Sequence, residues 1–307
     1  MSSITVEALE KRFGSFVAVD GISFDVREGE IFGFLGPNGA GKSTTVNMLT
    51  CQLRPTGGTA HVKGIPLTDE RGIRSIIGIV PQELALNDLL TAYQNLVLYG
   101  SLYGVSRVDA KRRALEMLEA MGLEKRKNDL VKDFSGGMKQ RLNVVMALMH
   151  EPKVLFLDEP TTGMDPQARR MIWDFIRDIN KRGTTIFLTT HYMEEADYLC
   201  NRVAIIDEGR IKAIDTPRAL KRQIKGEDII QIQVDEDERL LDDVKGIPNV
   251  KDALYANGML KLFIEDRDGL LLDIATVLSG RSIVSISSAE PTLEDVFLSL
   301  TGKKLRD

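Results

Sequence analysis

The sequence has few of the residues that form disulfides or bind transition metals. Its 307 residues include only two cysteines, Cys51 and Cys200, and three histidines, with no CxxC motif and no two histidines close together. Disulfide frameworks and zinc sites need such pairs. We therefore expect neither a disulfide nor a zinc site. We also expect the protein to lie in a reducing cytoplasm.

Long apolar runs are also missing. A transmembrane helix needs ~18 consecutive apolar residues, whereas IFGFLG (31–36) and VVMALM (144–149) have only the length of core segments. The N-terminal MSSITVEALEKRFG carries charges of both signs and no apolar stretch of the kind found in signal peptides. We expect a mature N-terminus and a peripheral place on the cytoplasmic side of a membrane, reached only through a partner.

The chain lacks an excess of basic residues. Residues 226–307 hold nine Lys+Arg against 17 Asp+Glu, a net charge of −8, and residues 1–225 hold 31 against 28, a net charge of +3. The sequence therefore lacks the basic patch that is typical of nucleic-acid-binding proteins. The shift in charge, together with a length typical of about two domains, predicts a domain at 1–225 and a smaller one at 226–307.

Apolar periodicity predicts an α/β fold for the first domain. The first 80 residues have the patterns of strands and turns ahead of one helix. Residues 85–150 have mainly helical spacing and form a predicted helical subdomain. The strands VLFLD (154–158) and TIFLTT (185–190) are separated by a helical segment, which indicates a parallel sheet core. An antiparallel β subdomain and a hairpin turning at Glu208-Gly209 complete this prediction.

The pattern changes after Gly226. Two strand-helix-strand units, joined by a hairpin around Asn257-Gly258, give the order β-α-β-β-α-β of a ferredoxin-like α+β domain. The closing PTLEDVFLSLTG predicts a short helix with Thr292 and Asp295 near its start and an apolar face at Leu293, Val296, Phe297 and Leu300. This domain has no catalytic constellation, and we expect it to brace a dimer of the larger domain, with this apolar face packing on the larger domain or on the other copy.

A complete phosphate-binding motif lies early in the chain. GPNGAGKS, Gly36 to Ser43, fits G-x-x-x-x-G-K-[ST] between a predicted strand and a predicted helix. In such a loop the backbone N–H groups hold phosphates, Lys42 reaches the β and γ oxygens, and the hydroxyl of Ser43 ligates Mg²⁺. The motif predicts binding of a nucleoside triphosphate.

Two adjacent carboxylates end the apolar strand in VLFLDEP. Asp158 would hold Mg²⁺ directly or through water, and Glu159 would orient or deprotonate the attacking water. An unpaired buried charge is costly, so two of them after four apolar residues indicate a catalytic function.

A second phosphate cradle, FSGGMKQR (134–141), lacks the lysine of a P-loop. Such a cradle can complete a site whose lysine and Mg²⁺ lie elsewhere. Four further groups suit a shared nucleotide site: Phe13 to stack on adenine, Gln82 to sense the γ-phosphate and Mg²⁺, Asp165 after the carboxylates, and His191 at the end of a strand. Alone, Phe13 is equally well a core aromatic. A lone histidine is more often structural, but the position of His191 directly after TIFLTT favours contact with the γ-phosphate.

Six of these features resemble the ATP-binding cassette (ABC) family. In chain order across residues 1 to about 220 they are the P-loop, Gln82, FSGGMKQR, VLFLDEP, Asp165 and His191. The resemblance implies two cassettes packed head to tail, with Ser135 to Gly137 of one closing over ATP held by the other. It implies Glu159, His191 and Gln82 as catalytic residues, Ser43, Gln82 and Asp158 as Mg²⁺ ligands, and as nucleotide-binding residues Phe13, Gly36, Asn38, Gly39, Ala40, Gly41, Lys42, Ser43, Thr44, Ser135, Gly136, Gly137 and Asp165.

The signature reads FSGGM where LSGGQ is commoner, and phosphate contact should survive because the serine and glycines remain. Together with the acidic C-terminal region, the chain resembles the ATP-binding subunits of daunorubicin-type drug-resistance exporters, which implies an ATPase driving a separate membrane permease. The cargo would be a drug, a lipid or another hydrophobic or polymeric compound. Its docking surface is predicted at Tyr93, Leu96, Leu98, Tyr99 and Tyr103.

Other functions remain open at this point. An importer subunit has the same cassette motifs. A soluble cassette protein acting on ribosomes or DNA is disfavoured by the single cassette and by the lack of sustained heptads. A kinase or GTPase on the same P-loop would leave FSGGMKQR and His191 unexplained, and the [NT]KxD guanine signature is missing.

Overall fold

A computed structural model describes residues 1–223, 228–234, 240–256, 258–264, 270–279, 281–289 and 291–301. The chain divides into two compact units, the first covering residues 1–214 and the second beginning at Asp215. No helix in the described parts is long and apolar enough to cross a bilayer.

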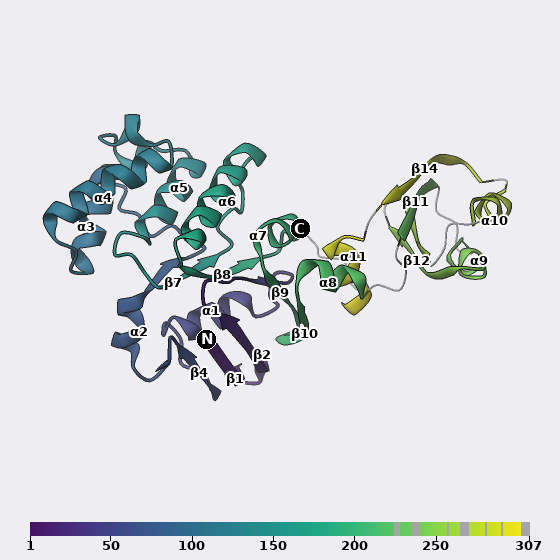
Figure 1. Ribbon diagram of the computed structural model, residues 1–307, viewed down its shortest axis with the longest axis horizontal. Helices are drawn as coiled ribbons and strands as arrows, with labels where there is room; N and C mark the ends of the chain where they lie inside the picture. The colour runs from purple at the N-terminus through teal and green to yellow at the C-terminus, as the bar shows by residue number, and fades with distance from the viewer. Residues whose placement is uncertain are drawn as a thin grey trace. The chain divides into compact units, whose positions relative to one another are not determined.

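A six-stranded sheet forms the centre of the first unit, in the order β10-β9-β3-β8-β7-β6 (Figure 1). Its strands are β3 (Ile31–Leu35), β6 (Ile77–Val80), β7 (Val154–Asp158), β8 (Thr185–Thr190), β9 (Arg202–Asp207) and β10 (Arg210–Asp215). Neighbouring strands from β9 to β6 run parallel. The buried, unbroken apolar sequence of β3 and β7 is typical of parallel strands covered on both faces.

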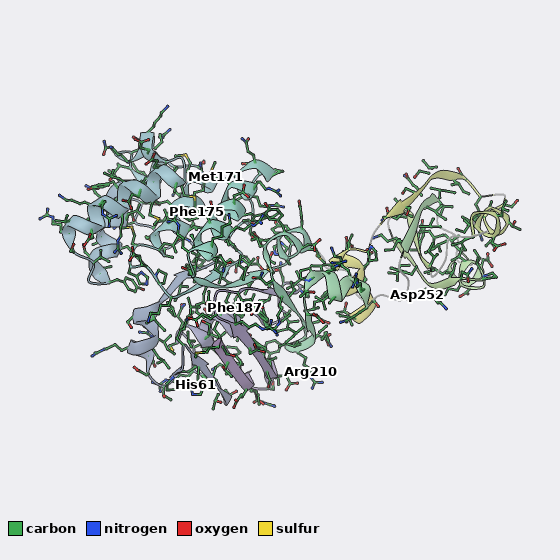
Figure 2. The ribbon with its side chains drawn as sticks, viewed as in Figure 1. His61, Met171, Phe175, Phe187, Arg210 and Asp252 are labelled. Atoms are coloured by element: carbon green, nitrogen blue, oxygen red, sulfur yellow. The ribbon has the colours of Figure 1, made fainter. Side chains whose placement is uncertain are left out.

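A second, antiparallel sheet packs over one face of the central sheet. It has the order β2-β1-β4-β5, with β1 (Ser2–Phe13), β2 (Phe16–Arg27), β4 (Gly57–Val62) and β5 (Ile65–Pro66). Helix α1 (Lys42–Leu49) contributes Val46, Met48 and Leu49 to the apolar cluster that both sheets share. Phe187 of β8, labelled in Figure 2, lies among four phenylalanine rings of that core, whose centroids are 5.5–5.9 Å from its own.

The remaining helices of this unit are α2 (Glu70–Ile76), α3 (Ala92–Leu102), α4 (Arg107–Ala120), α5 (Gly136–Met146), α6 (Pro166–Lys181) and α7 (Met193–Leu199), with short 3₁₀ turns at Glu124–Arg126 and Val131–Asp133. Helices α3, α4 and α5 pack on one another and form the predicted helical subdomain (Figure 1). Thr91 and Gln94 make a reciprocal capping box that starts α3.

The second unit has the ferredoxin-like order β-α-β-β-α-β. Its antiparallel sheet runs β12-β13-β11-β14, built from β11 (Asp228–Val234), β12 (Val250–Ala256), β13 (Met259–Ile264) and β14 (Ile283–Ala289) with α9 (Leu240–Lys245) and α10 (Leu270–Val277). Helices α8 (Pro217–Arg222) and α11 (Leu293–Thr301) contact each other in this unit. The hydroxyl of Thr292 and the carboxylate of Asp295 cap α11 reciprocally.

The predicted fold class is confirmed, and two details differ. Helix α2 was not anticipated, because its seven polar-rich residues follow strand-like sequence. Leu300 is 38% exposed, so only three of the four apolar residues predicted for the face of α11 are buried, namely Leu293, Val296 and Phe297. The hairpin at Glu208-Gly209 is present, with both residues at positive φ, whereas Asn257 of the other predicted hairpin lies outside the described residues.

Candidate active site

The parallel sheet brings four of the predicted motifs to one edge. Leu35 of β3 is in register with Thr190 of β8, and Asp158 of β7 with Thr189. Val80 of β6 is in register with Leu157. The P-loop, Gln82, Glu159 and His191 each follow directly after one of these strands. The carboxyl edge of a parallel sheet is where such folds bind ligands.

The P-loop exposes backbone N–H groups at the start of α1. Gly41 is the N-cap at φ 101°, and no side chain caps the helix, so its first N–H groups stay available to an anion. A Cβ on Gly41 would come within 2.5 Å of the Ala18 carbonyl oxygen. Glycine is therefore required at position 41 by both conformation and space.

A pocket of ≈ 360 Å³ opens in front of this loop. It is lined by Phe13, Phe16, Ala18, Asn38, Gly39, Gly41, Lys42, Ser43, Thr44, Gln82 and Glu159. Phe13 is 49% exposed and lies under the ammonium group of Lys11, which excludes the reading of Phe13 as a core aromatic. Gly36 and Ala40 are buried in the loop and do not line the pocket.

Lys42 and Glu159 form a buried ion pair in the pocket. The ammonium group lies 3.0 Å from Oε1 of Glu159 and donates to the carbonyl oxygens of Gly36 and Pro37 at 2.9 and 3.1 Å. Both side chains are at most 5% exposed. These contacts hold the ammonium group inside the loop, where a bound phosphate would replace the carboxylate as its partner.

His191 contacts the same carboxylate from the next strand. Its Nδ1 is 3.1 Å from Oε2 of Glu159. Burial opposes ionisation of Glu159, but the charges and hydrogen bonds of Lys42 and His191 outweigh it and lower the pKa of this carboxyl below its ordinary value. The backbone of Glu159 has φ 50°, a left-handed conformation that costs a non-glycine residue roughly 1–2 kcal/mol. Its placement is therefore imposed by the surrounding contacts.

Asp158 and Ser43 supply the oxygen ligands that Mg²⁺ prefers. Asp158 is 5% exposed and accepts a hydrogen bond from the hydroxyl of Thr189 on β8. No cluster of three or more acidic, histidine or cysteine side chains able to hold a metal occurs in the described residues. This donor set fits Mg²⁺, which proteins bind through one or two side chains together with phosphate oxygens and water.

Ser135, Gly136, Gly137 and Asp165 do not line the pocket. The hydroxyl of Ser135 caps α5 by accepting from the Met138 N–H at 3.3 Å, and the carboxylate of Asp165 caps α6 by accepting from the Ala168 N–H at 2.8 Å. Both residues are exposed. Within one chain these residues thus lie at the starts of α5 and α6, outside the pocket. Any nucleotide that they contact would have to be bound somewhere other than in this pocket.

Sequence reasoning missed three groups around the site. Phe16 pairs with Phe13 across the β1–β2 hairpin and lines the pocket; the spacing F-G-S-F could have revealed it. The side-chain amide of Gln140 donates to the Pro160 carbonyl at 2.8 Å, tying α5 to the segment after Glu159. Glu195 of α7 is fully buried and accepts hydrogen bonds from Thr161 and Trp173. The last two have no local sequence signal because their partners lie 20 or more residues away.

Replacing Glu195 with glutamine should change how stability depends on pH. Burial raises the pKa of this carboxyl against the hydrogen bonds it accepts, so the folded protein keeps a proton that the unfolded chain releases above pH 4.5. Wild-type stability therefore falls as pH rises from 4.5 toward the raised pKa. We expect Glu195→Gln to gain unfolding free energy relative to wild type across that interval, measured by urea unfolding at several pH values. Glu194→Gln changes an exposed neighbour, so its unfolding free energy should depend on pH as that of wild type does. If the unfolding free energies of wild type and Glu195→Gln changed in parallel with pH, the raised pKa of Glu195 would be contradicted.

Family profiles match both parts of the chain. The ABC transporter profile matches residues 19–162, and a profile described as the C-terminal domain of ATP-binding proteins like DrrA1-3 matches residues 216–301.

Curated relatives match over nearly the full length. The linearmycin resistance ATP-binding protein LnrL of Bacillus subtilis is 41% identical, covering 99% of this chain and 100% of the relative. The Nod factor export ATP-binding protein I of Burkholderia lata is 39% identical, covering 100% and 99%. The daunorubicin/doxorubicin resistance ATP-binding protein DrrA of Streptomyces peucetius is 38% identical, covering 99% and 94%.

Solved structures match the first unit. An ATP-binding subunit of an ABC transporter has 30% identity and a TM-score of 0.67 over 72% of this chain and 93% of that one. The ATP-binding cassette MJ0796, in a dimeric post-hydrolysis state bound to ADP and Pi, has 28% identity and a TM-score of 0.65 over 69% and 98%.

Proposed function

Because the chain belongs to the ABC transporter ATP-binding family and is an ATPase, we propose that it drives an exporter by hydrolysing ATP at the carboxyl edge of its central sheet. The observation that carries the proposal is the contact of Lys42, Glu159 and His191 beside the pocket. A phosphate-binding ammonium group and a carboxylate poised to take a proton are the two groups that ATP hydrolysis needs in one place.

Glu159 is proposed as the general base. When Lys42 turns to the γ-phosphate, Glu159 loses its ion pair, so its pKa rises toward the range in which a carboxylate accepts a proton from water. His191 keeps the carboxylate oriented through the Nδ1 contact. The ring of Phe13 at the pocket rim offers a stacking surface for the adenine.

Mg²⁺ is proposed as the cofactor, with Ser43, Asp158 and Gln82 as the residues that would hold it. When bound, the ion would neutralise charge on the β and γ phosphate oxygens. The buried hydrogen bond from Thr189 fixes the orientation of the Asp158 carboxylate, and Ser43 and Gln82 both line the pocket.

The functional assembly is proposed to be a head-to-tail dimer of cassettes. ABC ATP-binding subunits dimerise, and the surface position of Ser135 and Asp165 supports their use toward a neighbour's nucleotide. In this arrangement Ser135, Gly136 and Gly137 of one chain close over the ATP held by the P-loop of the other, and Asp165 lies between the two sites. Either an identical copy or a related cassette would satisfy this geometry.

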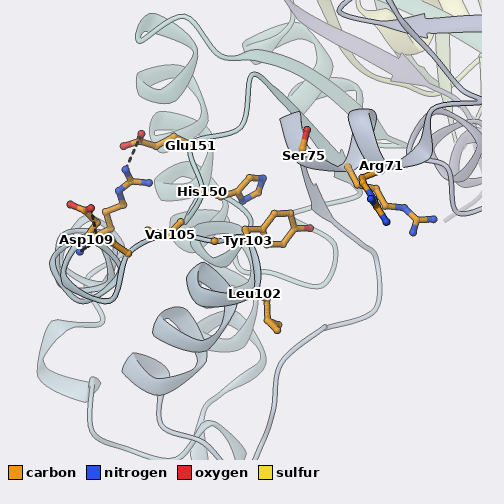
Figure 3. A pocket seen from close by; sticks show the side chains of 12 residues that line it. Arg71, Ser75, Leu102, Tyr103, Val105, Asp109, His150 and Glu151 are labelled. Atoms are coloured by element: carbon orange, nitrogen blue, oxygen red, sulfur yellow. Dashed lines mark hydrogen bonds and ion pairs between the residues drawn. The ribbon is translucent and has the colours of Figure 1, made fainter.

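The permease is proposed to dock in a groove beside α3 (Figure 3). This groove of ≈ 570 Å³ has Arg71, Arg74 and Ser75 of α2 on one wall and Leu102, Tyr103 and His150 on the other. Tyr103 stacks on His150 with centroids 4.0 Å apart. Exposed aliphatic and aromatic groups beside arginines suit a short amphipathic helix.

The prediction of the docking surface is wrong for one of its five residues, Leu96. Leu96 is fully buried and cannot contact a partner. Leu98 and Tyr103 are exposed, at 47% and 38%, and Tyr93 and Tyr99 are half-buried. Helix α3 buries Leu96 against its own subdomain because an amphipathic helix must cover one face.

Export is proposed as the direction of transport. The relatives' names refer to drug resistance and to Nod factor export, and the likeness extends through the C-terminal unit. The ATPase would act from the cytoplasmic side of the membrane through its permease, and the permease would select a drug, a lipid or a similar cargo.

Stimulation of ATP turnover by the permease tests this proposal. We expect Leu102→Asp, which places a charge on a 74% exposed groove residue, to lose most of the stimulation that wild type shows with its permease in liposomes. Val108→Asp is the matched control, because Val108 is 78% exposed on α4 and lies outside the groove. Equal stimulation of Leu102→Asp and wild type would rule out docking at this groove, and turnover stimulated by ribosomes or DNA alone would rule out a transporter.

A further inference from the structure

Glu195 carries a carboxyl group that the catalytic scheme above does not use. Its side chain is fully buried, and its Oε1 accepts from the Thr161 hydroxyl at 2.7 Å and from the Trp173 indole N–H at 2.8 Å. Burial raises the pKa of this carboxyl, opposed by hydrogen bonds with Thr190, Thr161 and Trp173 and, least of these, by the charge of Arg169. A carboxyl buried without a strong ion pair is destabilising. Its presence therefore suggests that Glu195 has a function other than stabilising the fold.

The hydrogen bond between Glu195 and Thr161 joins the segments that carry Glu159 and His191. Thr161 follows Glu159 by two residues, and Glu195 follows His191 by four, in the first turns of α7. On the pocket side the same two segments meet through the 3.1 Å contact between Glu159 and His191. The Glu159 N–H also donates to the carbonyl oxygen of Thr189 on β8 at 3.1 Å, so Glu195 adds an interior link, through α7, to those at the pocket and along the sheet.

Two other hydrogen bonds hold the segment after Glu159 without involving α7. Thr162 bonds back to Oε2 of Glu159 at 3.2 Å, and Gln140 holds the Pro160 carbonyl from α5. Both contacts fix the segment after Glu159 but do not reach α7. Trp173 extends the link to α6, the helix that Asp165 caps.

We propose that Glu195 is a positioning residue for ATP hydrolysis, which sets the distance between Glu159 and His191 by holding Thr161 from within α7. The inference rests on the proposed roles of Glu159 and His191. If the interior link is cut, α7 and the catalytic segment can separate while the P-loop stays intact. Turnover should then fall without a matching loss of ATP binding, since a misplacement of about 1 Å at a catalytic group can cost ~100-fold in rate.

The test replaces Thr161, because a change there leaves the buried carboxyl and the fold in place. Thr161→Val keeps the side-chain volume and removes the hydroxyl donor; Thr161→Ser keeps the donor. We expect Thr161→Val to lower kcat roughly 10-fold or more with the KM for ATP within about 2-fold of wild type, and Thr161→Ser to retain wild-type kcat. Glu195→Gln, which keeps an acceptor oxygen, should likewise exceed Glu195→Leu in kcat.

Steady-state kinetics of these four variants and of Glu159→Gln separate this inference from the proposed function. Wild-type kcat in Thr161→Val, with Glu159→Gln inactive, would overturn the positioning role and leave the catalytic assignment standing. Equal losses in Thr161→Val and Thr161→Ser would also overturn it, because the hydroxyl would then not matter. ATP turnover at the wild-type rate in Glu159→Gln would instead contradict the proposed function, in which Glu159 is the general base.

Discussion

Replacing Glu159 with glutamine should lower the kcat for ATP hydrolysis by roughly 100- to 10,000-fold, the range that a general base contributes. An amide cannot accept the proton of the attacking water, and it also loses the ion pair that Oε1 makes with Lys42 at 3.0 Å. The P-loop and the pocket remain, so ATP should still bind. Phosphate release under saturating ATP, together with equilibrium binding of a fluorescent ATP analogue, measures the two effects separately.

The same substitution should trap a dimer. If ATP closes two cassettes and hydrolysis reopens them, a chain that binds ATP without hydrolysing it accumulates in the closed state. Size-exclusion chromatography with light scattering, in ATP and Mg²⁺, would detect it. Glu194→Gln provides the control, since Glu194 is an exposed acidic residue on α7. A monomeric Glu159→Gln that hydrolyses ATP at the wild-type rate would contradict both the base assignment and the dimer.

The sequence predicts well those features that depend on short segments. The P-loop and the strand that ends at Asp158 are local patterns, and the parallel sheet necessarily brings the residues after β3, β7 and β8 to one edge. The β-α-β-β-α-β order of the second unit followed in the same way from alternating strand and helix patterns. Helix α2 escaped prediction because seven residues offer too few turns for a clear period.

Features that depend on contacts between distant segments were not predictable. Glu195 looks like any acidic residue at a helix start, and only the fold places it against Thr161, 34 residues earlier. Leu96 and Leu98 are two residues apart on the same helix, yet one is buried and the other exposed. The helical pattern of α3 shows that it has a buried face and does not reveal which residues belong to that face.

Mixing two inactive variants should restore activity if each ATP site is shared between two chains. Lys42→Ala removes the phosphate-binding ammonium group. Ser135→Asp keeps a good N-cap for α5 but directs a negative charge at the partner's phosphates. Each variant alone should hydrolyse ATP at least roughly 100-fold more slowly than wild type.

In a mixed dimer the two defects fall on the same site. The intact Lys42 of one chain then faces the intact Ser135 of the other, and random pairing of equal amounts should recover about one quarter of the wild-type rate per chain. Phosphate release after mixing and incubation with ATP measures the recovery. A mixture of Lys42→Ala with the double variant Lys42→Ala/Ser135→Asp is the control, because none of its dimers contains an intact site.

Ser135→Asp decides whether the second cradle takes part at all. Among the residues that the structure describes, its hydroxyl caps α5, a function that aspartate fulfils equally well. A Ser135→Asp chain that turns over at the wild-type rate would therefore mean that FSGGMKQR approaches no nucleotide. An inactive Ser135→Asp chain that Lys42→Ala rescues would mean that the P-loop of one chain and the cradle of another act on the same ATP molecule, since no single chain in that mixture carries both groups.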